Sequence, residues 1–369
     1  MPIWPCSDSP RQLDHEKEDR MATSIVGIDI GSTTIRAVEL ADPGKPKPTL
    51  LRHHAVPIPE GAAARGEVLE PNTIAAGLRQ LWQQGGFKSK EVVLGMGNQR
   101  VLARDLTVPR MSQTRIRESL PFLVQDMLPV PVADALLDFY PISEGMGEAG
   151  PVVNGLLIAA VKEAVDANVK AAQLAGLIPV EVDLLPFALT RAMLSRPGVA
   201  GTAALVDIGA NTTSVVVATD GVPQFVRIIP AGGAELTQAL RSGLDVSAGE
   251  AERIKAETGL ARQVTSLEEQ QAVEIVYRVT GELLTSLRNT ISYFVNTRPS
   301  TPVERILLTG GGSQLPGMVE ALGEMTRIPV SPGDPFHSVT LSRHLDAAQL
   351  RQNRSALSAA LGLALGSAA

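Results

Sequence analysis

An aspartate inside an apolar, strand-like run is the feature that most constrains this chain. Residues 26–34 read VGIDIGSTT and residues 204–213 read ALVDIGANTT, so one pattern, apolar-Asp-x-Gly-small-x-Thr, occurs twice. A further apolar run follows each copy, IRAVEL after the first and SVVVAT after the second, and this order predicts strand, turn and strand. A pattern repeated at two distant places predicts two similar halves, which would face each other across a cleft.

The residue types in these turns favour a phosphate ligand. Backbone N–H groups of small residues in a tight turn cradle phosphate oxygens, and the Ser and Thr hydroxyls add donors. A buried carboxylate is costly without a partner, and a hydrated Mg²⁺ would reconcile Asp29 and Asp207 with a polyphosphate. A single Asp-x-Gly fits equally well a plain strand end that enters a turn. Two copies, each at the start of a half, favour metal and phosphate.

A third stretch, residues 305–322, reads RILLTGGGSQLPGMVEAL and predicts a buried strand, a glycine-rich turn and a helix. Three consecutive glycines let the backbone approach a flat ligand, although a tight connection alone would also explain them. The sequence contains neither a G-x-x-x-x-G-K-[ST] loop nor a G-x-G-x-x-G fingerprint. The signal therefore lies in the order of the three motifs.

Composition excludes some classes of protein. The formal net charge of −6 over 369 residues provides no basic field, so we expect no nucleic-acid partner. No run reaches the roughly 18 apolar residues of a membrane-spanning helix, and the start of the chain is charged where a signal peptide is apolar. We therefore expect a cytoplasmic protein. We expect residues 1–22, which include the single cysteine, Cys6, to form a disordered leader. Met21 is an alternative start of translation.

The order of the motifs resembles the actin-like ATPase superfamily over residues 24–369. The resemblance implies an α/β fold of the actin-like (ribonuclease H-like) two-lobed type, with an inserted α+β subdomain in the first lobe, and it implies ATP and Mg²⁺ as ligands. The implied metal residues are Asp29 and Asp207, acting through water. The implied nucleotide residues are Asp29, Gly31, Ser32, Thr33 and Thr34 in the first turn, Asp207, Gly209, Asn211 and Thr212 in the second, Gly232 and Gly233 before a helix, Glu252 and Lys255 on a helix that reaches the ribose and base, and Gly310, Gly311, Gly312 and Ser313 beside the adenosine.

Two of these assignments keep a plain alternative. Glu252 and Lys255 lie three residues apart on one helix face, which also fits a solvated ion pair.

The resemblance divides the chain as follows: residues 23–90, 174–200 and 355–369 form the first lobe, 91–173 the inserted subdomain, 201–238 and 301–354 the second lobe, and 239–300 its helical subdomain.

Between the halves, the stretches VPRMSQTRIRESLPFLVQDMLPVP, IAAVKEAVD and DLLPFALTRA resemble the PilM family of type IV pilus assembly proteins. This resemblance implies an ATP-binding cytoplasmic scaffold that binds the cytoplasmic N-terminal tail of a PilN-like inner-membrane protein. It also implies contact with other inner-membrane platform proteins of the pilus, an indirect association with the membrane, and possible homo-oligomers.

The tail site is expected on the insertion. Ile116, Leu120, Leu123 and Met127 recur at helical spacing and form an apolar stripe, with Arg115 and Arg117 beside it. Such a stripe is also what the subdomain's own core would need.

Three other functions found among actin-like proteins would each need a further sequence feature. A cell-division anchor like FtsA would need an amphipathic C-terminal helix, whereas the last residues read SALSAALGLALGSAA. A small-molecule kinase would need a catalytic base and polar sugar ligands. A DnaK-type chaperone would need a further substrate domain.

Catalysis is expected to be weak at most. Relatives of the PilM type commonly carry an acidic residue directly before the proline of PFAL, but this chain has Leu185 there. Leucine cannot accept a proton, and the nearest carboxylate in sequence is Asp183, the one candidate for a catalytic residue.

Overall fold

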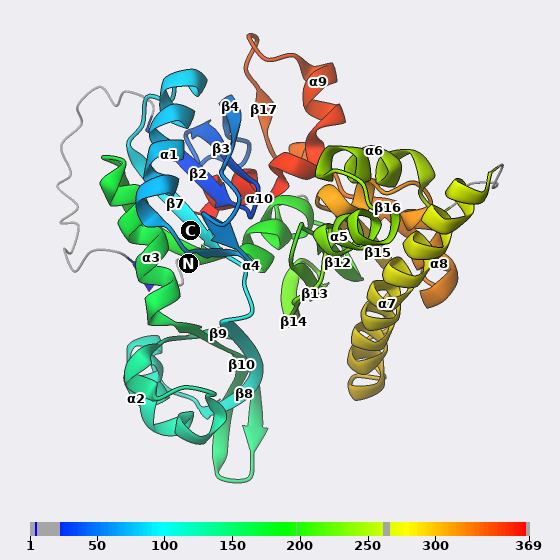
Figure 1. Cartoon of the computed structure of the whole chain (residues 1–369). Coiled ribbons are helices and arrows are strands. Elements are labelled where there is room, and N and C mark those ends of the chain that lie inside the picture. The colour runs from blue at the N-terminus through cyan, green and yellow to red at the C-terminus, as the bar shows by residue number, and fades with distance from the viewer. Residues whose placement is uncertain (1–3, 6–22, 197, 261–265, 367–369) are drawn as a thin grey trace.

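The chain forms two lobes side by side, with a smaller unit attached below the first lobe (Figure 1). The computed structural model describes residues 4–5, 23–196, 198–260 and 266–366. The predicted leader, residues 1–22, lies outside these ranges except for Trp4 and Pro5, which form a short strand. No helix in these ranges has both the length and the apolar character of a membrane span.

The first lobe is built on a seven-stranded sheet. Its strands lie in the order β1 (Trp4–Pro5), β11 (Ile178–Leu184), β7 (Glu91–Met96), β2 (Ser24–Ile30), β3 (Thr34–Ala41), β4 (Thr49–Pro57) and β17 (Thr340–Leu341). The helices of this lobe are α1 (Pro71–Gly85), α3 (Lys162–Leu174), α4 (Leu185–Thr190) and α10 (Arg354–Ala364), and a small hairpin pairs β5 (Ala63–Ala64) with β6 (Glu67–Val68).

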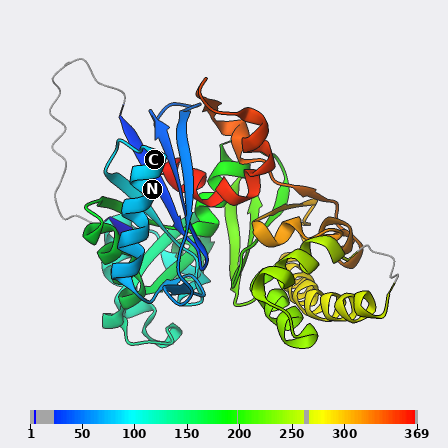
Figure 2. The ribbon, with the colours of Figure 1, turned by 45° about the horizontal axis from the view of Figure 1, so that its top comes forward.

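The second lobe repeats the central part of this sheet. Its five strands lie in the order β14 (Val222–Ile229), β13 (Thr213–Thr219), β12 (Thr202–Ile208), β15 (Arg305–Thr309) and β16 (Val330–Pro332). In both lobes the strand with the aspartate is antiparallel to the next strand in the chain and parallel to a later one. The order β4-β3-β2-β7-β11 thus matches β14-β13-β12-β15-β16, which confirms the predicted two similar halves. Figure 2 shows the two sheets next to each other.

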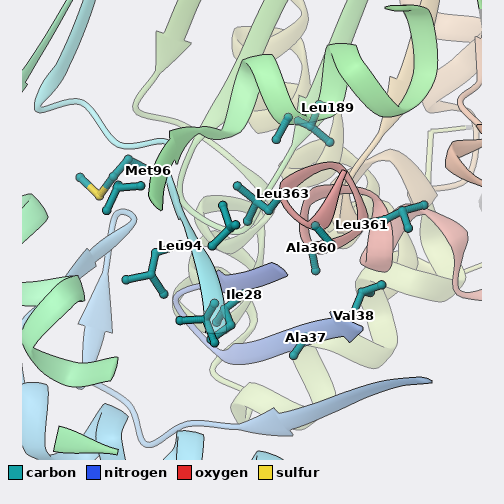
Figure 3. Packing of buried hydrophobic residues seen from close by; sticks show 14 of the residues in the cluster. Ile28, Ala37, Val38, Leu94, Met96, Leu189, Ala360, Leu361 and Leu363 are labelled. Atoms are coloured by element: carbon teal, nitrogen blue, oxygen red, sulfur yellow. The ribbon is translucent and has the colours of Figure 1, made fainter. Parts of the chain in front are cut away.

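Small residues let the C-terminal helix α10 lie directly on the first sheet. A Cβ atom added to Gly27 of β2 would overlap the carbonyl oxygen of Ala360, and one added to Gly362 would overlap the carbonyl oxygen of Ala188 in α4. The side chains of Ala360, Leu361 and Leu363 are fully buried between these elements (Figure 3). Burial of apolar surface of this kind is the main stabilising term in folding.

Helices form the outer part of the second lobe. They are α5 (Gly233–Leu244), α6 (Ala248–Thr258), the long α7 (Leu267–Thr297) and α8 (Met318–Thr326), and α9 (Ala347–Gln352) lies between the second lobe and α10 in the chain. Residues from α5, α6, α7 and α8 share one hydrophobic core with β12 and β15. These helices and the second sheet therefore behave as one packed body.

The smaller unit is a three-stranded sheet with one helix. β8 (Val101–Pro109), β10 (Gly150–Val161) and β9 (Ala135–Gly147) are antiparallel neighbours, and α2 (Gln113–Leu123) covers one face. On that face Ile116 and Leu120 of the predicted stripe are buried with Phe139 and Leu157. The opposite face, with Leu156 and Tyr140, joins the core of the first lobe.

The boundary of this insertion needs a correction. The segment 91–173 was expected to be inserted as a whole, but β7 lies between β2 and β11 in the large sheet, and α3 packs its buried face into the core of the first lobe. The separate sheet and its helix cover only residues 101–161. Residues 144–150 are mostly the paired ends of β9 and β10. β17, expected in the second lobe, pairs with β4 of the first.

Candidate functional site: a cleft between two equivalent turns

The two Asp-x-Gly turns have the same backbone geometry. In the first, the N–H of Gly31 donates to the carbonyl oxygen of Thr34 at 3.0 Å. In the second, the N–H of Gly209 donates to the carbonyl oxygen of Thr212 at 2.9 Å. Each turn therefore closes a hairpin and leaves the intervening N–H groups and hydroxyls at its tip, as a phosphate nest requires.

The aspartates before these turns lie in an unfavourable electrostatic environment. Burial raises the pKa of Asp29, against the opposing effect of Arg36. Burial, and then the charge of Asp29, raise the pKa of Asp207 to about 7. A carboxylate whose ionised form is disfavoured by burial and by a neighbouring carboxylate is a natural place for a cation.

Arg36 is a cleft residue that the sequence analysis missed. It lies directly opposite Asp29 in the β2–β3 pairing, and its Nη1 is 4.0 Å from Oδ2 of Asp29. The signal was available, because a hairpin closed at Gly31 and Thr34 places residues 29 and 36 opposite each other. The guanidinium gives the cleft one fixed positive charge.

The third motif lies on the second turn. Gly310 has φ +86°, and a Cβ atom there would come 2.7 Å from Oδ1 of Asp207 and closer still to the carbonyl oxygen of Ile208. A Cβ atom on Gly312 would overlap the side chain of Ile208. Glycine is therefore required at both positions for the loop to approach the turn so closely. Oγ of Ser313 donates to the carbonyl oxygen of Gly310 at 2.6 Å and stabilises the loop.

The start of α5 is tied to the second turn, and α6 is tied to α5. The N–H of Gly233 donates to the carbonyl oxygen of Gly209 at 2.9 Å. Nζ of Lys255 donates to the carbonyl oxygen of Gly233 at 2.9 Å and to Oγ1 of Thr237 at 3.1 Å, and lies 3.4 Å from the Glu252 carboxylate. Lys255 and Glu252 do form the i,i+3 pair of the alternative interpretation, but both also line the cleft.

Together these elements enclose a cleft of about 330 Å³ between the lobes. It brings together most of the predicted nucleotide residues, namely Asp29, Gly31, Ser32, Thr33, Asp207, Gly209, Asn211, Thr212, Gly233, Glu252, Lys255, Gly310, Gly311 and Gly312. Thr34, Gly232 and Ser313 do not line it and instead support the turns. Ser355, Ala356 and Ala359 of α10 also line the cleft and were not expected from the sequence, since their roles depend on how the chain returns to the first lobe.

Asp183 is not in the cleft, and its predicted catalytic role is corrected. Its side chain is fully buried, accepts from Nη2 of Arg191 at 2.8 Å and from the N–H of Leu184 at 2.7 Å. Arg191 also donates to the carbonyl oxygen of Gly362 at 2.8 Å, so the pair fastens β11 to α10. A carboxylate held in this way has no access to a ligand in the cleft.

Leu185 does line the cleft. Its side chain packs so closely on Gly95 and Gly97 of the β7 end that a Cβ atom on either glycine would collide with it. At the position where the resemblance implied an acidic group, the cleft therefore has an apolar wall.

The donor set of the cleft fits Mg²⁺ better than a softer metal. In the described part of the chain no three His, Cys, Asp or Glu side chains cluster as a metal cage. Mg²⁺ needs no such cage, because it prefers one or two carboxylates together with water and phosphate oxygens. Asp29 and Asp207, with the hydroxyls of Ser32, Thr33 and Thr212, match that preference.

A second cavity, of about 260 Å³, lies where the inserted sheet meets α4. Its walls are partly aromatic, since the rings of Tyr140 and Phe187 pack at a centroid distance of 4.8 Å. An ion pair lies among its lining residues, with Nε of Arg117 donating to Oδ1 of Asp138 at 2.9 Å. Gln113, Phe139, Pro141 and Ile158 complete the lining.

Comparison with known proteins decides the family. Residues 27–368 match the family described as type IV pilus assembly protein PilM. The chain belongs to the PilM family. A solved structure described as the PilM-PilN type IV pilus biogenesis complex superimposes with a TM-score of 0.82 at 27% identity, covering 94% of this chain and 98% of that one.

More distant relatives agree on the fold. The ethanolamine utilization protein EutJ of Carboxydothermus hydrogenoformans gives a TM-score of 0.55 at 17% identity, covering 94% of this chain and 90% of that one. MreB 5 of Spiroplasma citri, whose structure was solved with bound AMPPNP, gives a TM-score of 0.53 at 10% identity, covering 93% of this chain and 95% of that one. The predicted actin-like fold is thereby confirmed.

Curated relatives are cell-division proteins. FtsA of Bacillus subtilis is 26% identical over 199 residues, which are 50% of this chain and 45% of that protein. FtsA of Neisseria meningitidis is 25% identical over 229 residues, which are 55% of each chain. The chain thus spans about half the length of the curated relatives it matches. These matches fit the actin-like branch and support the FtsA-like alternative only weakly.

Proposed function

We propose that this PilM-family chain is a nucleotide-binding adaptor of type IV pilus assembly, with ATP and Mg²⁺ in the cleft and the tail of a PilN-like membrane protein in the second cavity. The observation that carries the proposal is that one cleft collects equivalent turns from both lobes. A ligand that touches both turns necessarily fixes how the lobes lie relative to each other.

The cleft residues divide the work of binding. Backbone N–H groups and hydroxyls at the tips of the two turns donate to phosphate oxygens, and Arg36 adds a positive charge beside Asp29. Asp29 and Asp207 hold the metal through water, and a bound Mg²⁺ supplies the charge that lets both carboxylates ionise. Glu252 and Lys255, which line the same cleft, would contact the ribose and base.

The same residues argue against rapid hydrolysis. A general base must lie within hydrogen-bond reach of the attacking water. The candidate Asp183 is buried with Arg191, and Leu185 presents only methyl groups. We therefore propose that the nucleotide acts chiefly as an effector that sets the relative position of the lobes, with turnover slow or absent.

The second cavity suits a short peptide segment. Its aromatic and aliphatic lining would take apolar side chains, and the Arg117–Asp138 pair offers a donor and an acceptor at the wall. The exposed Phe122 and Leu123 at the end of α2, 84% and 45% exposed, give a further apolar surface on the same subdomain. The predicted stripe itself is not free, because Ile116 and Leu120 are buried in the subdomain core.

The adaptor would be cytoplasmic and peripheral to the inner membrane, held there by its partner. Contacts with other inner-membrane platform proteins, and homo-oligomers, belong to the same proposal. The similarity to the structure described as a PilM-PilN complex supports the PilN-like partner.

A cavity-filling substitution tests the tail site. Gln113 is exposed and lines the second cavity, so Gln113→Trp would fill it without removing a core side chain. Gln125→Trp is the matched control, since Gln125 is exposed on the same subdomain and does not line the cavity.

Calorimetry would measure the binding of a synthetic peptide with the N-terminal cytoplasmic residues of a PilN-like protein. We expect Gln113→Trp to weaken binding at least about tenfold and the control to leave it unchanged. Equal binding by both variants would contradict the cavity as the tail site.

A further inference from the structure

An ion pair joins the second lobe to the inserted subdomain. Arg298 directly follows α7, and its Nη2 donates to both carboxylate oxygens of Asp105 on β8 at 2.8 Å. The same nitrogen lies 3.5 Å from the carbonyl oxygen of Gln224 on β14, and the guanidinium lies 5.1 Å from the ring centroid of Phe294. The subdomain that emerges from the first lobe is thus held to the second lobe as well.

In the second lobe, Arg298 directly follows a helix that is packed into the core of that lobe. Phe294, one turn earlier on α7, is fully buried in the core that α7 shares with α5, α6 and β12. The cleft residues Gly233, Glu252 and Lys255 lie on α5 and α6. A movement of the second lobe that follows from the cleft would therefore carry Arg298 with it.

In the insertion, Asp105 lies in the same cross-strand row as Tyr140, which lines the second cavity. The strand register places Asp105 of β8 opposite Leu156 of β10, and Leu156 opposite Tyr140 of β9. Residues opposite each other across a sheet point to the same face, and their side chains are close enough to interact. Tyr140 lines the cavity and packs on Phe187, so one row of three residues connects the ion pair to the cavity wall.

The pair is suited to being made and broken. The side chain of Asp105 is 64% exposed and that of Arg298 is 26% exposed. Exposed ion pairs contribute little to stability, so their loss would not unfold the protein. A contact of this kind between two bodies can respond to a small rotation of one against the other.

We propose that Arg298 and Asp105 form a latch that couples the nucleotide cleft to the tail cavity. Nucleotide in the cleft sets the position of the second lobe, the latch transmits that position to β8, and the row Asp105–Leu156–Tyr140 changes the cavity. By linkage, the tail must change the affinity for nucleotide by the same factor. This inference rests on the proposed function, because it needs both ligands.

The test is the effect of Mg²⁺·AMPPNP on the affinity for the synthetic tail peptide, measured by calorimetry on the full chain. The variants are Arg298→Asp, Asp105→Arg, and the double variant that carries both changes and restores an ion pair with its charges exchanged. The control is Arg110→Glu, which breaks the Arg110–Glu144 pair, 3.3 Å long and exposed, within the insertion. Circular dichroism melts would verify that every variant folds.

In the unaltered chain we expect nucleotide to change the peptide dissociation constant at least about fivefold, a usual size for allosteric coupling. The ratio of the peptide dissociation constants without and with nucleotide should lie within about twofold of one in each single variant. The double variant should restore the ratio of the unaltered chain, and Arg110→Glu should keep that ratio. Hydrogen exchange supplies a readout without peptide, because AMPPNP alone should alter exchange in residues 135–147 of the unaltered chain but not of Arg298→Asp.

Single variants that keep the ratio would overturn the latch, as would an unaltered chain that binds both ligands with a ratio of one. Failure of the unaltered chain to bind nucleotide or peptide at all would instead overturn the proposed function, and the latch with it. The two failures are therefore distinguishable.

Discussion

Asp29 and Asp207 end equivalent strands of two equivalent sheets and line one cleft, where burial and then the charge of Asp29 raise the pKa of Asp207 to about 7. A protein that needed only a stable fold would gain by replacing Asp207, because burial and the neighbouring charge of Asp29 both disfavour its ionised form. This arrangement supports the proposed cation ligand.

The approach of the glycine loop to the second turn can be tested at two adjacent positions. Gly310→Ala should lower the free energy of unfolding by at least about 2 kcal/mol, because Gly310 has φ +86° and its new Cβ would lie 2.7 Å from Oδ1 of Asp207. Gly311→Ala should change it by less than about 0.5 kcal/mol, since no atom lies within 4 Å of a Cβ there. Urea unfolding measures both, and equal effects would contradict the described loop geometry.

Stability should depend on pH through Glu181. Burial, followed by the charge of Asp183, raises the pKa of Glu181 from 4.5 to about 7, against the opposing effect of Arg191. Between these values the unfolded carboxyl is ionised while the folded one keeps its proton, so the folded state binds more protons and stability falls as the pH rises. The loss is complete above about pH 7 and amounts to about 3 kcal/mol.

Glu181→Gln should therefore raise the free energy of unfolding at pH 8 and flatten its dependence on pH between 5 and 8. Denaturant unfolding at several pH values checks this. Glu60→Gln is the control, because Glu60 is exposed. A Glu181→Gln variant that remained as pH-dependent as the unaltered chain would refute the assignment.

Hydrolysis should be slow because the cleft lacks a base near its apolar wall. We expect phosphate release below about one per minute at saturating Mg²⁺·ATP. Leu185→Glu would place a carboxylate in the cleft and should raise turnover at least about tenfold, whereas Leu185→Gln should not. Rapid release by the unaltered chain would show that another group serves as the base.

Local pattern predicted the turns well, because their geometry is encoded in adjacent residues. One repeated motif singled out Asp29, Gly31, Asp207 and Gly209, and a backbone hydrogen bond closes each of the two predicted turns. Leu185 was noticed in the sequence, but its place in the cleft wall depends on Gly95 and Gly97, which come from a strand far away in the chain.

The errors concern contacts between distant segments. Along β11 the side chain of Asp183 points to the face opposite to those of Val182 and Leu184. This strand pattern does not reveal that Arg191 lies on that face and pairs with Asp183. The resemblance implied that residues 91–96 belong to the insertion, whereas the hydrogen bonds of β7 place it between β2 and β11. Strand order is set by tertiary packing, which a single-sequence pattern does not encode.

We propose that both lobes bind one Mg²⁺·nucleotide through their paired aspartates. Calorimetric titration of Mg²⁺·AMPPNP into the unaltered chain and into Asp207→Asn tests this directly. Asp126→Asn is the control, since Asp126 is exposed on the insertion and does not line the cleft. We expect one site in the unaltered chain and in the control, and an affinity at least about tenfold weaker in Asp207→Asn, because the variant lacks one of the two anions proposed to hold the metal. Equal affinity in all three proteins would contradict the proposal.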